Sequence, residues 1–209
     1  SISHDYMGAH VAIRGSGGIL IEGKVQLHGG YNFDNLLMAV AIANESGIDP
    51  IDIAAILPHL SGAVGRLESV RLGQNFTALV DYAHSPDAVA RVLETAHEIT
   101  DGRVIAVLGC GGDRDTSKRA LMGKALHDGA DIAIFTSDNP RSEAPGEILS
   151  QMTHSLTFTA PSQVIEDRED AIRTAVALAT HVSSGTITSS PGPISKDNKA
   201  ICNAPVQLD

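Results

Sequence analysis

The segment RVIAVLGCGGDRDTSKRALMGKALHDGADIAIFTSDNPR, residues 103–141, decides the fold of this chain. Its two apolar runs, RVIAVLG and ADIAIFTS, have the length and the Val and Ile content of buried strands. Between them lie a glycine-rich loop and KRALMGKALHDGA, which has the length of a helix. The order of strand, helix and strand indicates a parallel sheet in an α/β fold.

The same alternation continues on both sides of this segment. Upstream, FTALVDYAH (76–84) predicts a buried strand, and SPDAVARVLETAHEIT (85–100) predicts a helix with Ser85 as its N-cap. Further elements are expected downstream: helices over 144–156 and 168–180, a short strand at Val164 and Ile165, and a last strand at 185–190. The final 25 residues are otherwise irregular. The pattern predicts a doubly wound, mainly parallel sheet.

The first 63 residues are organised differently. Three short strands are expected, each ending at glycine: HVAIRG (10–15), GILIEG (18–23) and KVQLHGG (24–30). Residues 31–46 then have helical spacing of apolar side chains, and PIDIAAILPHL (50–60) predicts a second, shorter helix. The glycine-punctuated segment SGAVGRLESVRLG (61–73) is the candidate domain boundary.

Composition restricts the classes of function. The chain of 209 residues is 43% hydrophobic, has no Trp, and carries a net charge of −10, which argues against a nucleic-acid surface. Cys110 and Cys202 form neither a disulfide framework nor a metal motif, so no metal site is expected. No apolar run approaches the roughly 20 residues of a membrane span. The first residues lack an initiator Met and a signal peptide, so we expect a cytoplasmic protein, of which this chain is an internal part.

Three loops follow the three expected parallel strands: DYAHSP (81–86), GCGGDRD (109–115) and SDNPR (137–141). In an open parallel sheet, ligands bind beyond the carboxyl ends of the strands. All three loops carry charged residues and precede a helix. We therefore expect them to converge on one edge of the sheet and to form the site.

The glycine loop GCGGDRDTSKR (109–119) allows two interpretations. Its backbone N–H groups and the following helix start can bind an anion, and Arg114, Lys118 and Arg119 can meet carboxylate or phosphate oxygens. Alternatively, Arg114 and its two flanking aspartates form a local salt-bridged cap. The loop is not a P-loop, and Arg114 replaces the third glycine of the dinucleotide fingerprint, which argues against a nicotinamide oxidoreductase.

The other two loops are also open to two interpretations. DYAHSPDA (81–88) is either a plain capped helix start or a site in which Asp81 binds a ribose and His84 lies near phosphates. TSDNPRSEAP (136–145) is either a turn with a solvated Arg141 or a turn that holds a small zwitterionic ligand. Pattern alone does not decide between them.

Five segments taken together closely resemble the Mur ligase family. In chain order they are GGYNFDNLLMAVAIA, GRLE, VDYAHSPDAV, GCGGDRDTSKRALMG and SDNPRSEAP, and the similarity covers roughly residues 28 to 180. Within the family they are most similar to the UDP-N-acetylmuramoyl-tripeptide synthetases. The DNPR sequence is the pattern associated with enzymes that add meso-diaminopimelate rather than lysine.

The resemblance implies an architecture and an activity. Residues 1–63 would be the end of the central ATP-binding domain, itself an α/β ATPase domain, and residues 64–209 the carboxyl-terminal Rossmann-like domain. The family uses ATP and Mg²⁺ to convert the carboxylate of UDP-MurNAc-L-Ala-D-Glu into an acyl phosphate. The amine of the incoming amino acid then displaces phosphate, in peptidoglycan synthesis. The resemblance also leads us to expect a monomer.

The resemblance also implies site residues. ATP would be bound by four residues: Asn35 near the adenine, Arg66, Asp81 at the ribose, and His84. Meso-diaminopimelate would be bound by five: Arg114, Asp138, Asn139, Pro140 and Arg141. An arginine fork binds a carboxylate through two bonds, and an aspartate pairs with an ammonium group. Lysine lacks the second carboxylate and would leave one arginine without its partner.

The chain departs from the family pattern in two places. The P-loop, the carbamylated lysine, the magnesium ligands and the catalytic residues would lie upstream of residue 1, and the isolated chain would then be inactive. The late GKGHE segment of the family aligns with SPGPI (190–194), where Pro193 and Ile194 replace a histidine and a glutamate. The alternative to a ligase is therefore a non-catalytic fragment or a nucleotide- or amino-acid-binding module of the same fold.

Overall fold

A computed structural model describes residues 1–5, 8–100, 102–157, 161–181 and 199–202. The chain forms two compact units, Ser1–Leu67 and Glu68–Asp209. The division falls within the glycine-punctuated segment 61–73. Each unit has its own sheet and its own buried core, so each is described by itself.

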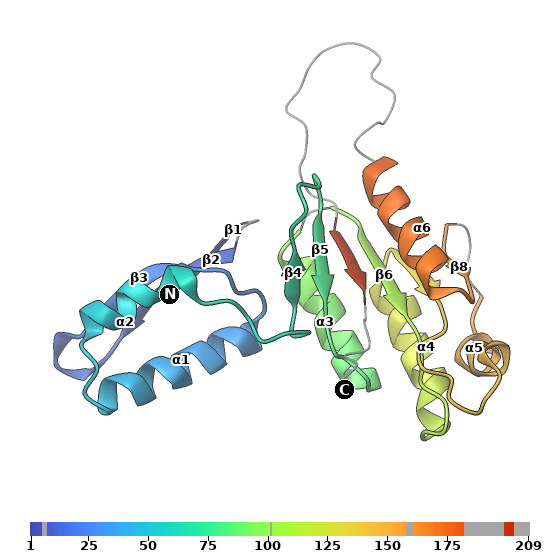
Figure 1. Cartoon of the computed structure of the whole chain (residues 1–209), viewed down its shortest axis with the longest axis horizontal. Coiled ribbons are helices and arrows are strands. Elements are labelled where there is room, and N and C mark those ends of the chain that lie inside the picture. The colour runs from blue at the N-terminus through green and yellow to red at the C-terminus, as the bar shows by residue number, and fades with distance from the viewer. Residues whose placement is uncertain (6–7, 101, 158–160, 182–198, 203–209) are drawn as a thin grey trace, which may run out of the picture. The chain divides into compact units, whose positions relative to one another are not determined.

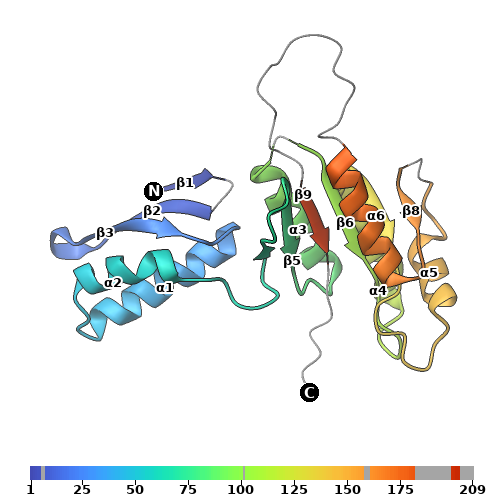
Figure 2. The ribbon, with the colours of Figure 1, turned by 45° about the horizontal axis from the view of Figure 1, so that its top comes forward.

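The first unit is a three-stranded antiparallel sheet with helices on one face (Figure 2). Its strands are β1 (Ile2–Asp5), β2 (Gly8–Arg14) and β3 (Leu20–Val25), in that order across the sheet. Helix α1 (Gly30–Glu45) and helix α2 (Pro50–Ile56) follow, and a single 3₁₀ turn, η2 (Leu57–His59), ends the second helix. Helix α1 buries Phe33, Leu36 and Val40 against the sheet, at the helical spacing that the sequence shows.

The strands of this unit differ from the sequence prediction. Strand β3 crosses the boundary between the two strands expected at 18–23 and 24–30, residues 26–29 form no strand beyond an isolated bridge at Gln26, and β1 is not among the expected strands. Gly23 lies inside β3 and faces Leu57. A Cβ at residue 23 would be 3.0 Å from Cδ1 of Leu57, so the glycine allows a close contact and does not mark the end of the strand. A glycine at a close contact was thus mistaken for a turn.

The second unit contains a six-stranded sheet of order β4-β5-β9-β6-β7-β8 (Figure 1). Its strands are β4 (Glu68–Val70), β5 (Thr77–Val80), β6 (Val104–Leu108), β7 (Ile132–Phe135), β8 (Gln163–Val164) and β9 (Lys199–Cys202). Only the pairing of β4 with β5 is antiparallel among these described strands. The prediction of a mainly parallel sheet is confirmed.

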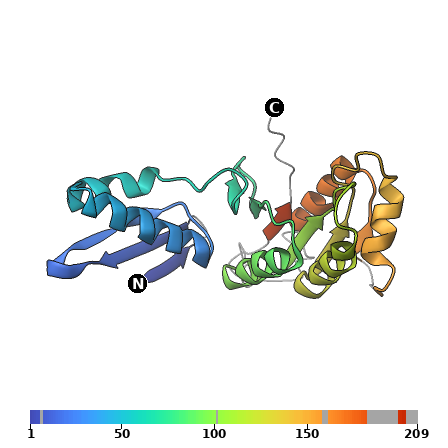
Figure 3. The same ribbon diagram turned by 90° about the horizontal axis from the view of Figure 1, so that it is seen from below.

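The described part of this unit has four helices: α3 (Pro86–Glu98), α4 (Ser117–Gly129), α5 (Pro145–Thr153), which packs on α4, and α6 (Arg168–His181). Helices α3 and α4 lie on one face and α6 on the other, so the sheet is doubly wound as predicted (Figure 3). The Ser85 side chain accepts a hydrogen bond from the N–H of Ala88 and caps α3, also as predicted. Helix α6 approaches the sheet closely because its inner face carries alanines, of which Ala171, Ala175 and Ala179 are fully buried.

Strands β4 and β9 were not predicted. The sequence expectation placed residues 68–70 in a linker and left the last residues irregular, apart from a strand at 185–190 that lies outside the described residues. The structure instead inserts β9 between β5 and β6, parallel to both. Strand β9 has only four residues, so it shows no periodicity, and its position is determined by the strands on both sides of it.

Substitution of Gly123 in α4 tests how closely α4 packs on α5. A Cβ at this position would overlap the backbone carbonyl oxygen of Met152. We expect Gly123→Ala to lower the free energy of unfolding by about 1–3 kcal/mol despite the better helix propensity of alanine. Urea denaturation followed by circular dichroism measures this loss. Gly146→Ala in α5, where the added Cβ meets only a side-chain atom at 3.4 Å, is the matched control. Equal denaturation midpoints for the two variants would contradict the packing.

Candidate functional site

The loops after β6 and β7 are bound to each other at the carboxyl edge of the sheet. The N–H of Gly112 donates to the carbonyl oxygen of Asn139 at 2.8 Å, and Nη1 of Arg141 donates to the carbonyl oxygen of Gly112 at 2.6 Å. The Cβ that Gly112 lacks would overlap the carbonyl oxygen of Pro140. A Cβ at Gly109 would lie 2.5 Å from the carbonyl oxygen of Thr136. The glycines of this loop thus permit contact between the two loops.

The carboxylate of Asp115 is hydrogen-bonded to the first residue of α4. Asp115 accepts from the N–H of Ser117 at 3.1 Å and from its hydroxyl at 2.6 Å, and these bonds hold the pKa of Asp115 below its usual value. Lys118 lies 3.8 Å from the same carboxylate. Because Asp115 fills the anion position of this helix, the expected binding of a ligand anion at the helix start finds no support.

The sequence interpretation of Arg119 as a ligand-facing residue is wrong. Only 1% of Arg119 is exposed, and its guanidinium donates two bonds of 2.7 Å to the carboxylate of Glu143. It also donates to Gln151 Oε1 at 2.9 Å and to the carbonyl oxygen of Gly111 at 3.2 Å. A signal was present in the sequence, since Arg119 shares its helix face with the buried Met122 and Leu126.

Glu143 links the ion pair to the glycine loop through a further hydrogen bond. Its Oε1 accepts from the N–H of Asp113 at 2.6 Å, and the Asp113 carboxylate in turn accepts from the hydroxyl of Ser142 at 2.7 Å. The hydrogen bonds from Arg119 and Asp113 lower the pKa of Glu143 to about 2. The bond to Glu143 raises the pKa of Arg119. Both groups therefore stay charged at neutral pH.

Arg114 and Arg141 lie over the same backbone position. A Cβ on Gly111 would be 3.0 Å from Nη1 of Arg141 and 3.9 Å from Cγ of Arg114. Both arginines are exposed, and Arg141 has a left-handed backbone with φ of 50°. Arg114 forms no ion pair with any described residue, because Asp113 binds Ser142 and Asp115 binds Ser117 and Lys118. The interpretation of Arg114 as part of a salt-bridged cap is therefore not supported.

The remaining residues of the DNPR turn have different surroundings. Asp138 is partly buried, and one carboxylate oxygen lies 4.0 Å from Nη1 of Arg168, the first residue of α6. The same nitrogen donates to the carbonyl oxygen of Ser137 at 3.0 Å. Asn139 is exposed, and its backbone holds Gly112. The turn is thus fixed by α6 on one side and by the glycine loop on the other.

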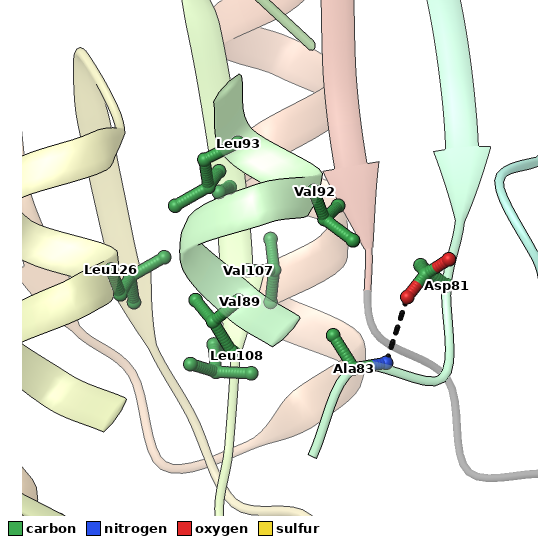
Figure 4. Close-up of a pocket in the computed structure, with 9 residues that line it drawn as sticks. Asp81, Ala83, Val89, Val92, Leu93, Val107, Leu108 and Leu126 are labelled. Atoms are coloured by element: carbon green, nitrogen blue, oxygen red, sulfur yellow. Dashed lines mark hydrogen bonds between the residues drawn. The ribbon is translucent and has the colours of Figure 1, made fainter. Parts of the chain in front are cut away.

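Asp81 and His84 follow strand β5 in the second unit. Asp81 is 5% exposed, and its Oδ1 accepts from the N–H of Ala83 at 2.8 Å. It lies at the edge of a pocket with about 300 Å³ of empty space, part of it open to solvent, which apolar residues of α3 and β6 line (Figure 4). His84 is exposed, and its Nδ1 lies 3.0 Å from the carbonyl oxygen of Tyr82.

Asn35 and Arg66 belong to the first unit. Both are exposed. The Asn32 side chain, one turn before Asn35 in α1, donates to the carbonyl oxygen of Arg66 at 3.4 Å and to that of His28 at 2.8 Å. This contact brings the GRLE segment to the start of α1. The four residues predicted to bind ATP are therefore divided between the two units, two in each.

A family model described as "Mur ligase, glutamate ligase domain" matches residues 65–189. The chain belongs to this family. The match includes both of the loops that carry Arg114 and Arg141. It also includes Arg119 and Glu143.

Curated relatives and solved structures agree with this membership. A ligase from Geobacillus thermodenitrificans, named UDP-N-acetylmuramoyl-L-alanyl-D-glutamate--2,6-diaminopimelate ligase, is 47% identical over 157 residues, which are 75% of this chain and 32% of the relative. A protein of the same name from Streptomyces coelicolor is 46% identical over 172 residues, 80% of this chain and 34% of the relative. The chain thus spans about a third of the length of these relatives.

A solved structure of an enzyme with that name covers 98% of this chain and 38% of its own, with 32% identity and a TM-score of 0.65. A folylpolyglutamate synthase structure from Mycobacterium tuberculosis covers 98% of this chain and 44% of its own, with a TM-score of 0.67. Its identity is 21%, so this second likeness concerns the fold alone.

Three sequence expectations concern metal ligands, membrane spans and the SPGPI segment of this Mur ligase chain. Among the described residues, no cluster of three or more His, Cys, Asp or Glu could hold a metal ion, and no helix is long and apolar enough to cross a membrane. The SPGPI segment (190–194), which aligns with GKGHE, lies outside the described residues. Its departure from the family pattern therefore stays a sequence observation.

The low pKa of Glu143 gives a pH-dependent stability. Its pKa falls from 4.5 to about 2 on folding, so the ionised pair contributes fully above about pH 4.5 and its contribution disappears as the pH falls to about 2. Glu143→Gln removes this contribution. We therefore expect the gap in urea midpoint between wild type and Glu143→Gln to be largest above pH 4.5 and to narrow on acidification.

Circular dichroism of urea titrations between pH 6 and pH 2.5 measures this gap. Ile148→Val, which shortens a buried apolar side chain in α5 without changing a charge, is the control, and its gap should not vary with pH. A gap for Glu143→Gln that stays constant with pH would contradict the ionised pair.

Proposed function

We propose that this chain is the carboxyl-terminal part of an ATP-dependent amide ligase that adds meso-diaminopimelate to UDP-MurNAc-L-Ala-D-Glu in peptidoglycan synthesis. The names of relatives at 46–47% identity support this substrate pair. Residues 1–63 are proposed as the end of the central ATP-binding domain and residues 64–209 as the carboxyl-terminal domain. The protein would act as a cytoplasmic monomer.

The observation that carries the proposal is the pair of exposed arginines, Arg114 and Arg141, above Gly111. Meso-diaminopimelate carries two carboxylates and two amino groups. A guanidinium binds a carboxylate through two parallel bonds, and Arg141 uses one nitrogen for Gly112, which leaves it further N–H groups for a ligand. Asp138, Asn139 and Pro140 complete the proposed amino-acid site. Asp138 would share its charge between Arg168 and a ligand ammonium group.

ATP would be bound by Asn35 and Arg66 from the first unit and by Asp81 and His84 from the second. The position of Asp81 supports this, because its carboxylate borders a pocket at the carboxyl end of β5. Mg²⁺ would accompany the nucleotide. The described residues offer no cluster of three or more His, Cys, Asp or Glu side chains for it.

In the proposed reaction, an oxygen of the glutamyl carboxylate bonds to the γ-phosphorus of ATP, the bond to the β-phosphate oxygen breaks, and ADP leaves. The neutral amine nitrogen of meso-diaminopimelate then bonds to the acyl carbon, the bond from that carbon to the phosphate oxygen breaks, and inorganic phosphate leaves as the nitrogen loses a proton. The residues of this chain would hold the amino acid so that its amine faces the acyl carbon. Their role is binding and orientation.

Arg141→Ala in the intact protein tests the proposal. A charge-assisted bond contributes about 1.5–3 kcal/mol, and each 1.4 kcal/mol is about a factor of ten, so the KM for meso-diaminopimelate should rise at least tenfold. The KM for ATP should stay unchanged. Each constant is measured from the rate of phosphate release as the concentration of that substrate is varied, with the other substrates held constant.

Arg173→Ala is the matched control, because Arg173 is an exposed arginine of α6 that pairs with Glu169 and lies outside the proposed site. It should leave both constants unchanged. An unchanged KM for meso-diaminopimelate in Arg141→Ala would refute the assignment of this arginine.

A further inference from the structure

Arg119 and Glu143 form a charged pair just behind the proposed ligand site. The side chain of Arg119 is 2% exposed and that of Glu143 is 25% exposed. Two bonds of 2.7 Å join the guanidinium to the carboxylate in a fork. The Nε of Arg119 is buried and has no hydrogen-bond partner among the described residues. A pair of apolar side chains could fill this space without that penalty, so stability alone does not explain the pair.

Arg119 and Glu143 form hydrogen bonds to residues near Arg114 and Arg141. Nη2 of Arg119 donates to the carbonyl oxygen of Gly111, over which Arg114 and Arg141 lie. Glu143 accepts from the N–H of Asp113, the residue before Arg114. Its own N–H donates to the carbonyl oxygen of Pro140, the residue before Arg141, at 3.0 Å. The side chains of the pair thus bind the loop that carries Arg114 and the carbonyl of Gly111, over which both arginines lie, while the backbone of Glu143 closes the turn at Arg141.

The backbone at these positions needs such support. Asp113 has φ of 52° and Arg141 has φ of 50°, a left-handed conformation that residues with a Cβ rarely adopt. Such conformations persist only where the surrounding structure holds them. Glu143 holds Asp113 directly, and it closes the turn that contains Arg141.

We infer that Arg119 and Glu143 are positioning residues that set the separation and direction of Arg114 and Arg141, and thereby the affinity for the amino acid with two carboxylates. This inference rests on the proposed function. Two guanidinium groups bind two carboxylates of one small molecule more tightly when their spacing is fixed beforehand, because less conformational freedom is lost on binding. The pair performs this role through the loop backbones and does not touch the ligand.

The double variant Arg119→Met with Glu143→Leu separates positioning from stability. Replacing a buried ion pair by apolar side chains of similar size is often neutral for stability, so the urea midpoint should change little. The hydrogen bonds from Arg119 to the carbonyl oxygen of Gly111 and from the N–H of Asp113 to Glu143 are lost. We expect the KM for meso-diaminopimelate to rise about tenfold or more, with the KM for ATP changed less than twofold.

Two comparisons accompany this variant. Lys124→Met with Asp128→Leu removes an exposed ion pair from the same helix and should leave every constant unchanged. Arg119→Lys keeps the charge but loses the fork, so its KM for meso-diaminopimelate should lie between wild type and the double variant. A purely structural role would not produce this graded change in one KM alone.

The assay is amino-acid-dependent phosphate release by the intact protein with meso-diaminopimelate as the probe. A folded double variant with an unchanged KM for meso-diaminopimelate overturns the inference while the proposed function stands. If the double variant has a lowered urea midpoint, Arg119→Lys, which keeps the charge, is assayed instead, and equal rises in the KM for ATP and for meso-diaminopimelate overturn the inference. A wild-type protein that does not respond to meso-diaminopimelate refutes the proposed function, and the inference with it.

Discussion

The close backbone contact between Gly112 and Pro140 is the constraint on which the site depends. With a Cβ at residue 112 the two loops could not approach, because that atom would overlap the carbonyl oxygen of Pro140. The contact lets Gly112 bond to Asn139 and to Arg141, and it brings Arg114 and Arg141 over one backbone position. The glycine-rich loop of this Mur ligase chain therefore serves loop–loop packing, whereas a loop of this composition after a strand more commonly suggests a phosphate cradle.

Local pairing of charges makes the proposed carboxylate site compatible with a chain of net charge −10. Around the two loops, Arg119 is paired with Glu143, Lys118 lies beside Asp115, and Arg168 lies beside Asp138. Arg114 and Arg141 are then the exposed arginines of the two loops that form no ion pair with a described residue. A carboxylate ligand would supply the partners for them, and the resulting selectivity comes from placed charges, since the overall charge of the chain is negative.

The sequence predicted those parts of the structure that rest on local pattern. Strands β5, β6 and β7 are short apolar runs and helices α3 to α6 are segments of helical length that follow them, and the loops after the strands lie at the edge where a parallel sheet binds ligands. Strand β9 could not be predicted, because only its neighbours β5 and β6 give a four-residue segment its place. Arg119 was misread for a similar reason: its burial depends on Glu143, 24 residues away, although its spacing from Met122 and Leu126 was visible. Tertiary partners decide both cases, and only for Arg119 does a local pattern also point to burial.

The most direct test of the account is the rate of phosphate release by the intact protein with meso-diaminopimelate and with lysine, at fixed UDP-MurNAc-L-Ala-D-Glu and ATP. Lysine has one carboxylate fewer, so it would leave one of the two arginines without a partner in a site built for two. The account predicts that kcat/KM for meso-diaminopimelate exceeds that for lysine by about a hundredfold or more. Equal values for the two amino acids would contradict the assignment of Arg114 and Arg141 as a paired carboxylate site.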